Sequence, residues 1–231
     1  MAGVLVQVYV LSEQVAGGLT AARWGTLRIE ALSRVFGRRR WDEVVFWALD
    51  LEMSGLHPGT DRILPIGMVP IRQGVIRYGE RFYSLVRPPD INGLSTEGLR
   101  AHHILPAEIA DAPILLEVLP EVDRRLREGT LLVHFAQLDL AFLRDGYRRC
   151  GMRWPRPPLV DTMNLLFDHH RRLRQWTPHP PPPRTALGEA RADLGLPAYP
   201  AHDALSDALA TAELFLVLRS RLGLEKLRGI Q

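Results

Sequence analysis

The chain has 231 residues, of which 46% are hydrophobic and 24% charged, and its formal net charge is +3. This length can bury one sizeable core with a small extension. The single cysteine, Cys150, excludes an intrachain disulfide framework and a thiolate metal cluster. No apolar stretch reaches the length of a membrane span, so we expect a cytoplasmic protein without membrane contact. The slight positive charge permits an acidic partner such as nucleic acid but does not require one.

The chain divides into a leader, a main domain and a tail. We expect residues 1–40 to be an N-terminal extension of uncertain structure, residues 41–222 to form the main domain and residues 223–231 to be a short C-terminal tail. The extension ends in the triplet 38–40 of arginines, which could touch phosphates but is more typical of a solvated face. Residues 44–51 are apolar on both faces until Asp50, which predicts a buried central strand with Asp50 at its end.

Two β-rich runs follow, at residues 63–71 and 75–86, and Arg72-Gln73-Gly74 between them predicts a hairpin. Pro65 and Pro70 lie within the first run. Proline cannot donate a hydrogen bond to a β-ladder, so these two residues favour an edge strand or a bulge there.

Helices and strands then alternate. We expect a helix at 113–127 that Pro120 kinks or splits, a strand at 131–135, a helix at 138–149 that Gly151 closes, and a strand at 159–161 followed by a helix through residue 174. The proline-rich segment 176–184 should be a stiff loop, more plausibly a surface connector than a docking peptide. Two last helices are expected at 186–194 and 204–221. This order predicts an α/β protein with a mixed sheet flanked by helices.

The first candidate site residues are Asp50 and Glu52. Residues two apart on a strand face the same side, so both carboxylates can reach one cation. Two carboxylates on an apolar strand also carry a desolvation cost that a cation would offset. The alternative is that both residues simply leave the core where the strand ends.

Asp139, His202 and Asp207 are the other candidates. Asp139 opens a predicted helix, where it could also serve as a favourable anion in the first turn. His202 should lie in the loop that enters the last helix, and Asp207 on that helix. A histidine on a loop can take a proton from a metal-bound water, but Asp203 could be an N-cap with His202 only its neighbour. Together the four carboxylates suit two hard divalent cations.

Other histidines are weaker candidates. His134 is more plausibly a core histidine with satisfied hydrogen bonds than a metal ligand. His169 and His170 point in different directions on a helix beside several arginines, so a solvated basic face is more plausible there than a metal site.

Three segments together resemble the motifs of the DEDDh 3′→5′ exonucleases. They are Leu49-Asp-Leu-Glu-Met-Ser-Gly55, Leu131-Leu-Val-His-Phe-Ala-Gln-Leu-Asp-Leu-Ala-Phe-Leu143 and His202-Asp-Ala-Leu-Ser-Asp-Ala208. The resemblance covers about residues 44–218, and the order and spacing are similar to those of the proofreading epsilon subunits of bacterial DNA polymerase III. It implies an RNase H-like fold and hydrolysis of terminal phosphodiesters to nucleoside 5′-monophosphates.

The resemblance also assigns roles to residues. It implies that Asp50, Glu52 and Asp207 hold one Mg²⁺ or Mn²⁺, that Asp50 bridges to a second cation supported by Asp139, and that His202 is the general base. Contacts to the terminal nucleotide are implied for Met53 and Ser54, and His103 matches a frequent histidine of the family. In the second motif Phe135 replaces the usual asparagine and Leu138 the usual aromatic residue, which puts those nucleotide contacts in doubt.

The implied substrate is a single-stranded 3′ end, with DNA favoured over RNA, in proofreading or repair. An RNA-trimming exoribonuclease remains an alternative, as does, with less support, an inactive nucleic-acid-binding module. We expect no long C-terminal tether to a polymerase, so a stand-alone nuclease is as plausible as a polymerase partner.

Overall fold

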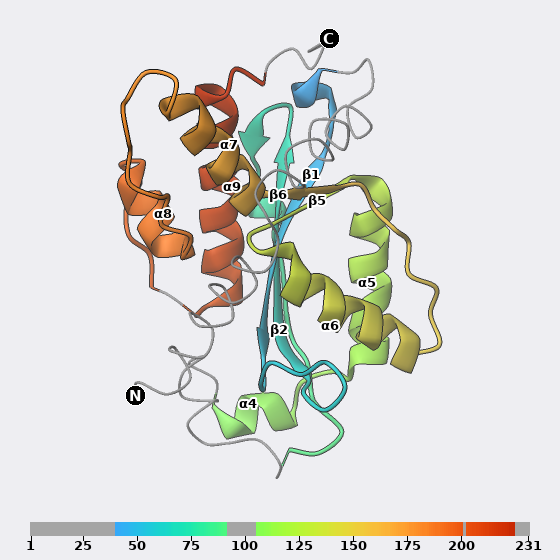
Figure 1. Ribbon diagram of the computed structural model, residues 1–231. Helices are drawn as coiled ribbons and strands as arrows, with labels where there is room; N and C mark the ends of the chain where they lie inside the picture. Colours follow the sequence, from blue (N-terminus) through green and yellow to red (C-terminus); the bar gives the residue numbers. More distant parts are fainter. Residues whose placement is uncertain (1–39, 92–104, 201, 225–231) are drawn as a thin grey trace.

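The computed structural model of the chain describes residues 40–91, 105–200 and 202–224 (Figure 1). The expected extension up to residue 39, the tail from residue 225 and the candidate His103 lie outside the described residues. Within the part that is described, none of the helices is both long and apolar enough to cross a membrane.

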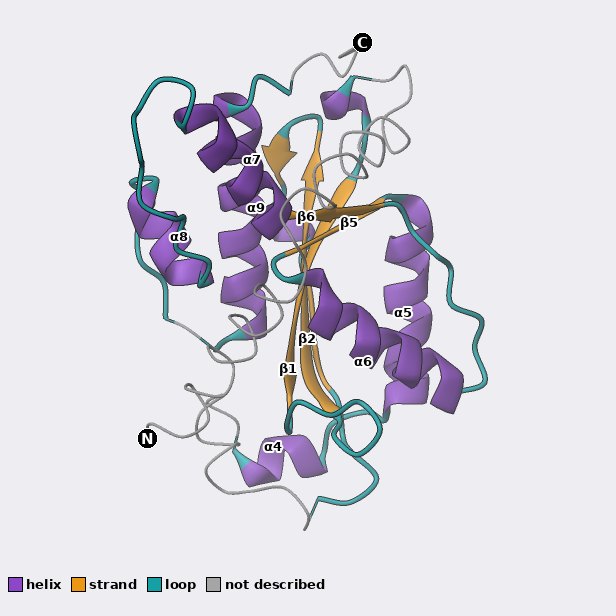
Figure 2. Ribbon diagram, viewed as in Figure 1, coloured by secondary structure: helices purple, strands orange, loops and turns teal. Residues whose placement is uncertain are grey.

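A six-stranded mixed sheet forms the centre of the fold (Figure 2). Its strands run in the order β3-β2-β1-β5-β6, and β4 pairs with β2. β1, β5 and β6 are parallel to one another, whereas β2 is antiparallel to β1, β3 and β4. The strands are β1 (Phe46–Met53), β2 (Ile63–Arg72), β3 (Val75–Ile76), β4 (Phe82–Leu85), β5 (Thr130–Val133) and β6 (Leu159–Asp161). The α/β class and the mixed sheet predicted from the sequence are confirmed.

Helices cover both faces of this sheet. In Figure 1, α5 and α6 lie on one side of the strands and α7, α8 and α9 on the other. Alternate residues of β1 serve the two cores: Trp47, Leu49 and Leu51 pack toward α5 and α6, while Phe46 and Ala48 pack toward α7 and α9. The described helices are α4 (Pro106–Ala110), α5 (Leu115–Glu128), α6 (Ala136–Arg149), α7 (Thr162–Leu173), α8 (Leu187–Asp193) and α9 (Ala204–Arg221), with short 3-10 turns η1 (Trp41–Glu43) and η2 (Tyr78–Glu80).

β1 begins and ends two residues later than the sequence predicted. It runs through both acids to Met53, because β2 continues to pair with it as far as the Met53–Ile63 pair. Asp50 is therefore inside the strand rather than at its end, opposite Gly67. The register shifts between Leu51 and Met53, so Glu52 lies at a bulge, a feature that redirects side chains beside active sites.

The two prolines lie in a strand that is not at the edge of the sheet. Pro65 falls where the register shifts opposite Glu52, so it occupies the bulge. Pro70 lies between the stretch of β2 that pairs with β4 and the stretch that pairs with β3. Its carbonyl still accepts the Arg77 N–H at 2.9 Å. The expectation of an edge or a bulge is thus confirmed only for Pro65, and Pro70 is accommodated by a gap between two partner strands.

The predicted hairpin forms, but its second arm is broken. Gln73 and Gly74 both have positive φ, 51° and 75°, as a two-residue hairpin turn requires. The expected single strand at 75–86 is wrong, because the turn η2 separates β3 from β4.

Pro120 does not split its helix. α5 is one helix of 14 residues, and Pro120, its sixth residue, faces solvent. The last helix has the bounds expected from the sequence, and the proline-rich segment 176–184 contains neither helix nor strand. No sequence repeat is visible in the order of these elements.

Candidate active site

Three carboxylates from two distant segments meet beside the sheet. Asp50 and Glu52 come from β1 and Asp207 from α9, and each offers an oxygen within 4.8 Å of those of the other two. Glu52 is only 8% exposed, whereas Asp50 and Asp207 are half-buried. The structure therefore brings together the first and third sequence motifs, which lie more than 150 residues apart.

Gly67 explains how α9 comes so close to β1. This residue of β2 pairs with Asp50, and a β-carbon on it would lie 2.3 Å from the Ala204 carbonyl oxygen and 2.6 Å from the Leu205 nitrogen. The first turn of α9 thus rests directly on the backbone of β2, which only glycine permits. This close approach places Asp207, one turn further along α9, against the carboxylate of Asp50.

The start of α9 is fixed by two hydrogen bonds. Asp203 is the N-cap, and its carboxylate accepts the Ser206 N–H at 2.7 Å, as one of the sequence interpretations proposed. The His202 N–H donates to Asp207 Oδ2 at 3.0 Å, and His202 has a positive φ of 66° and an exposed side chain. The capping interpretation of Asp203 is correct, and it leaves His202 beside the carboxylate group rather than removed from it.

Asp139 lies next to this group but is not a member of it. It is in the first turn of α6 and only 6% exposed. Burial and then the negative charge of Asp139 raise the pKa of Asp50 well above its usual range, as expected for neighbouring carboxylates. The structure thus gathers three of the predicted acids tightly and places the fourth beside them.

Asp161 is a site residue that the sequence interpretation missed. Its carboxylate accepts the N–H groups of Phe135 and Ala136, at 3.1 and 3.0 Å, and that of Met163 at 2.9 Å. One side chain therefore caps both α6 and α7. It also raises the pKa of Asp139, after the larger effect of burial. The signal was present in the sequence, since Asp161 ends a buried apolar strand just as Asp50 lies at the end of an apolar run.

His134 and Phe135 hold the turn between β5 and α6. His134 Nδ1 lies 2.8 Å from Thr162 Oγ1 and its Nε2 lies 2.7 Å from the Thr185 carbonyl oxygen, which can only accept. Burial lowers the pKa of His134, so its neutral ring donates from Nε2 to Thr185. The satisfied core histidine predicted from the sequence is confirmed. Phe135, the N-cap of α6, has a left-handed backbone with φ 68°, and this ends the strand two residues before the predicted end.

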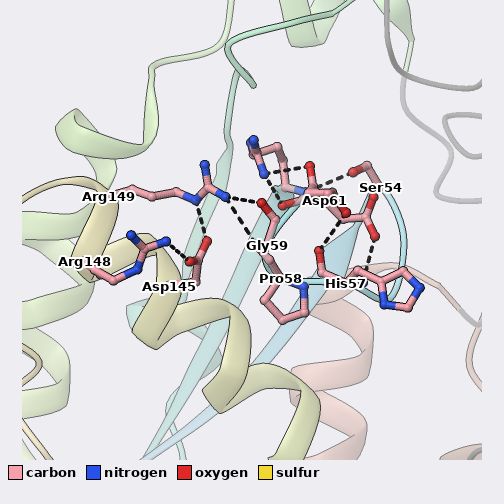
Figure 3. Close-up of polar contacts among 10 residues, drawn as sticks. Ser54, His57, Pro58, Gly59, Asp61, Asp145, Arg148 and Arg149 are labelled. Atoms are coloured by element: carbon pink, nitrogen blue, oxygen red, sulfur yellow. Dashed lines mark hydrogen bonds and ion pairs between the residues drawn. The ribbon is translucent and has the colours of Figure 1, made fainter.

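The loop that follows Glu52 is held by its own backbone and side chains (Figure 3). The Ser54 N–H donates to the Arg62 carbonyl at 2.9 Å, and the Arg62 N–H donates to Ser54 Oγ at 2.9 Å. Asp61 accepts the His57 N–H at 2.7 Å, and a β-carbon on Gly55 would lie 2.4 Å from the Asp61 carboxylate. Met53 and Ser54 are therefore presented by a closed loop rather than an extended one.

Arg149 ties this loop to α6. Its guanidinium donates to the Gly59 carbonyl at 2.5 Å and pairs with Asp145 on the preceding turn (Figure 3). The helix that carries Asp139 in its first turn thus contacts the loop after Glu52 through its last turn. This contact between α6 and the loop lies at the opposite end of the helix from Asp139.

The carboxylates raise one another's pKa. Burial raises the pKa of Asp139 well above its usual range, and the charges of Asp161 and Glu52 add to this. Burial, followed by the charge of Glu52, raises the pKa of Asp207 to about 6. Such mutual repulsion is typical of carboxylates built to hold cations.

The residues present fit hard divalent cations. The atoms that these residues offer to a cation are all carboxylate oxygens, the kind of ligand that Mg²⁺ and Mn²⁺ prefer. Among the residues that the structure describes, no arginine or lysine forms an ion pair with Asp50, Asp139 or Asp207. In the same described ranges, His169 and His170 belong to no group of three metal ligands.

Comparison with known proteins places this arrangement in a family. Residues 47–215 match the RNase T type of exonuclease, a span that contains all five candidate residues from Asp50 to Asp207. The chain belongs to the exonuclease family.

Relatives of this exonuclease include components of DNA polymerase III. A PolC-type DNA polymerase III of Thermotoga petrophila is 29% identical over 195 residues, which cover 83% of this chain and 13% of that protein. The DNA polymerase III subunit epsilon-like protein of Rhodobacter capsulatus is 31% identical, covering 82% and 25%. The epsilon subunit of Treponema pallidum is 28% identical and covers 77% of each chain. The chain thus spans only an eighth to a quarter of the length of several of its relatives.

Solved structures share the fold of the exonuclease. Cell-death related nuclease 4 superposes with a TM-score of 0.66 at 16% identity, covering 76% of this chain and 64% of that one. The zinc-bound complex of E. coli ExoI with single-stranded DNA gives 0.67 at 17% identity, covering 78% and 41%. The RNase H-like exonuclease fold implied by the sequence is therefore confirmed.

The raised pKa values predict how the stability of the metal-free exonuclease depends on pH. Asp207 keeps its proton up to about pH 6 when folded but loses it near pH 4 when unfolded. The stability that this difference contributes is fully present below pH 4 and is lost as pH rises through 6. We expect the melting temperature in EDTA to fall between pH 5 and 8. Over this range the loss corresponds to roughly 1.4 kcal/mol of unfolding free energy, one pKa unit between pH 5 and 6, and Asp207→Asn should remove this part of the fall.

Asp193→Asn provides the matched control. Arg184 lowers the pKa of this exposed carboxyl, so it stays charged above pH 5 in both states and its removal should leave the slope between pH 5 and 8 unchanged. Scanning calorimetry of the parent and the two variants in EDTA measures the slope of melting temperature against pH. Equal slopes for the parent and Asp207→Asn would contradict the prediction.

Proposed function

We propose that the chain is a metal-dependent 3′→5′ exonuclease that releases nucleoside 5′-monophosphates from single-stranded DNA. The observation that carries this proposal is the convergence of Asp50, Glu52 and Asp207 within 4.8 Å, with Asp139 beside them, in a chain of the exonuclease family. We take residues 41–222 as the exonuclease domain.

The carboxylates would divide between two cation positions. Asp50, Glu52 and Asp207 would hold one Mg²⁺ or Mn²⁺, and Asp50 and Asp139 would hold the second. Paired cations, when bound, stabilise both the attacking and the leaving oxygen of an in-line phosphoryl displacement. Mutual repulsion among these acids, visible in their raised pKa values, supports the assignment because bound cations would relieve it.

His202 would act as the general base. Its backbone N–H is bonded to the carboxylate of Asp207 just before α9 begins, and its side chain is exposed. From there it can accept the proton of the attacking water, a role for which imidazole is suited near neutral pH.

Contacts to the terminal nucleotide are assigned to residues at the borders of the carboxylate group. Met53 and Ser54 follow Glu52 directly, and Phe135 caps the helix that carries Asp139. His103 is retained as a candidate, although it lies outside the described residues.

DNA is the favoured substrate. The names of the relatives link them to DNA polymerase III, and one solved structure of the same fold is a complex with single-stranded DNA. A proofreading partnership with a polymerase and a stand-alone repair role are both compatible with these names, and the domain would perform the same hydrolysis in either.

Timed digestion of end-labelled single strands tests the proposal. With Mg²⁺ or Mn²⁺, a 3′-labelled DNA strand should lose its label at once as mononucleotide, while a 5′-labelled strand should shorten through a ladder. EDTA should stop both reactions. A matched RNA strand, run in parallel, decides between deoxyribonuclease and exoribonuclease activity.

Three results would overturn the proposal. They are no release with either cation, release that begins at the 5′ end, and internal fragments as first products. Release that persists unchanged in EDTA would remove the metal assignment.

A further inference from the structure

A pocket of about 560 Å³ lies beside α6, and none of the three clustered carboxylates lines it. Leu140 and Arg144 of α6 contribute to its lining. Arg153, Trp154 and Arg156 also line it, and they belong to the segment that leads from α6 to β6 along the outside of the molecule in Figure 1. None of the residues that line this pocket is acidic.

The three arginines of the pocket have no counterion in the described part of the chain. Arg144, Arg153 and Arg156 are all exposed, and no carboxylate of a described residue forms an ion pair with them. By contrast, Arg148 and Arg149 on the same helix both pair with Asp145. Three like charges around one hollow produce a positive potential that an anion would neutralise.

Trp154 gives the pocket a rigid aromatic wall. Its ring packs edge-on against the buried ring of Tyr147, with 5.1 Å between centroids and 87° between planes. Its side chain remains half-buried at the border of the core. An aromatic ring held among arginines is the combination by which proteins bind single-stranded nucleic acid, because bases stack on the ring while arginines contact phosphates.

The pocket shares α6 with Asp139 but lies on a neighbouring face of the helix. Leu140 follows Asp139 directly, and Arg144 lies five residues beyond it, roughly 7.5 Å along the helix axis and about 140° around it. A stacked strand advances about 3.4 Å per nucleotide. The pocket is therefore at least about two nucleotides along a strand from the point where Asp139 would act.

We propose that this pocket is a second binding site for the substrate strand, holding the phosphates and one base a few nucleotides behind the 3′ end. Trp154 stacks the base, and Arg144, Arg153 and Arg156 bind the phosphates. The proposal rests on the proposed function, since it places the strand that leaves the carboxylates. An acidic peptide would satisfy the arginines, but it would leave unexplained the stacking surface and the position on the helix of Asp139.

The test compares the triple variant Arg144→Ala/Arg153→Ala/Arg156→Ala with Arg148→Ala, a matched loss of an exposed arginine on α6 outside the pocket. Binding of a 5′-fluorescent 12-mer is measured by anisotropy in EDTA across a salt series. Turnover with Mn²⁺ is measured for the 12-mer and for thymidine 5′-monophosphate p-nitrophenyl ester, which has no upstream nucleotides. If the triple variant is unstable, the single variant Arg153→Ala, which changes one exposed loop residue, replaces it in the same assays.

We expect the triple variant to bind the 12-mer at least about tenfold more weakly at low salt. The slope of log affinity against log salt should fall by about 2, as for three phosphate contacts to a single strand. KM for the 12-mer should rise while turnover of the small ester stays at the parent value. Arg148→Ala should match the parent in every assay.

Unchanged affinity and KM for the 12-mer in the triple variant would overturn the proposal, as would an equal loss on the small ester. The pocket would be a peptide site instead if the parent bound an acidic peptide, the 12-mer did not compete with that peptide, and the triple variant no longer bound it. If the parent cleaves neither substrate, the proposed function fails, and the anisotropy series in EDTA still decides whether the pocket binds a strand.

Discussion

Asp50→Asn is expected to reduce nucleotide release by at least about a thousandfold. Asp50 is the residue common to both proposed cation positions, and its carboxylate faces Glu52, Asp207 and Asp139. Loss of several kcal/mol of transition-state stabilisation by the cations corresponds to a loss of this size. Timed release of 3′-labelled nucleotide measures the rate, and calorimetric titration with Mn²⁺ should show weakened binding.

The same variant should not unfold. Burial and neighbouring charge raise the pKa of Asp50, so a negative charge on this side chain destabilises the folded metal-free protein. Asn has the same shape and no charge, so the melting temperature in EDTA at pH 8 should equal or exceed that of the parent. An active Asp50→Asn enzyme, or an inactive one that has lost stability, would contradict the cation role.

His202→Gln is expected to lower turnover by about a hundredfold to ten-thousandfold, the range for loss of a general base. Unlike Asp50→Asn, it should leave Mn²⁺ affinity unchanged, since His202 is not part of the three-carboxylate group. The two variants thus separate cation binding from proton transfer. Turnover at saturating Mn²⁺ and calorimetric titration measure the two properties on the same preparations.

His179→Gln is the matched control for this prediction. His179 is also exposed and also has a positive φ, 50° against 66° for His202, so glutamine meets the same backbone conformation at both positions. The control should retain the activity of the parent. If His202→Gln keeps full turnover, or if it loses Mn²⁺ binding as well, the role of general base is wrong.

Hydrophobic patterning was enough to predict most of the elements. The apolar run before Asp50 predicted the central strand, and the spacing after Asp203 predicted α9 with its observed bounds. Helix-breaking rules were less reliable, because Pro120 faces solvent within an unbroken α5. The rule that confines proline to edges and bulges held at Pro65 but failed at Pro70, where a gap between two partner strands removes the need for the missing N–H.

The sequence was enough to predict the acids of the candidate site but not the residues that hold the neighbouring helices in place. Motif order identified Asp50, Glu52 and Asp207, and the structure brings them together. The position of Asp161 at the end of an apolar strand could have marked it as a candidate, but its capping role depends on backbone N–H groups of Phe135 and Ala136, whose positions depend on the fold. The roles assigned to Met53, Ser54 and Phe135 stay predictions.

Because of Gly67, the distance between the carboxylates does not depend on which side chains fill the core. Where α9 meets β2, main chain touches main chain, so the separation of Asp207 from Asp50 does not depend on the size of any side chain between them. Substitutions along the apolar side of α9 can therefore accumulate without changing the distance between these two carboxylates. A single added methyl group at residue 67 would instead clash with the main chain of α9 and move Asp207 away from Asp50, although both acids would remain in the sequence.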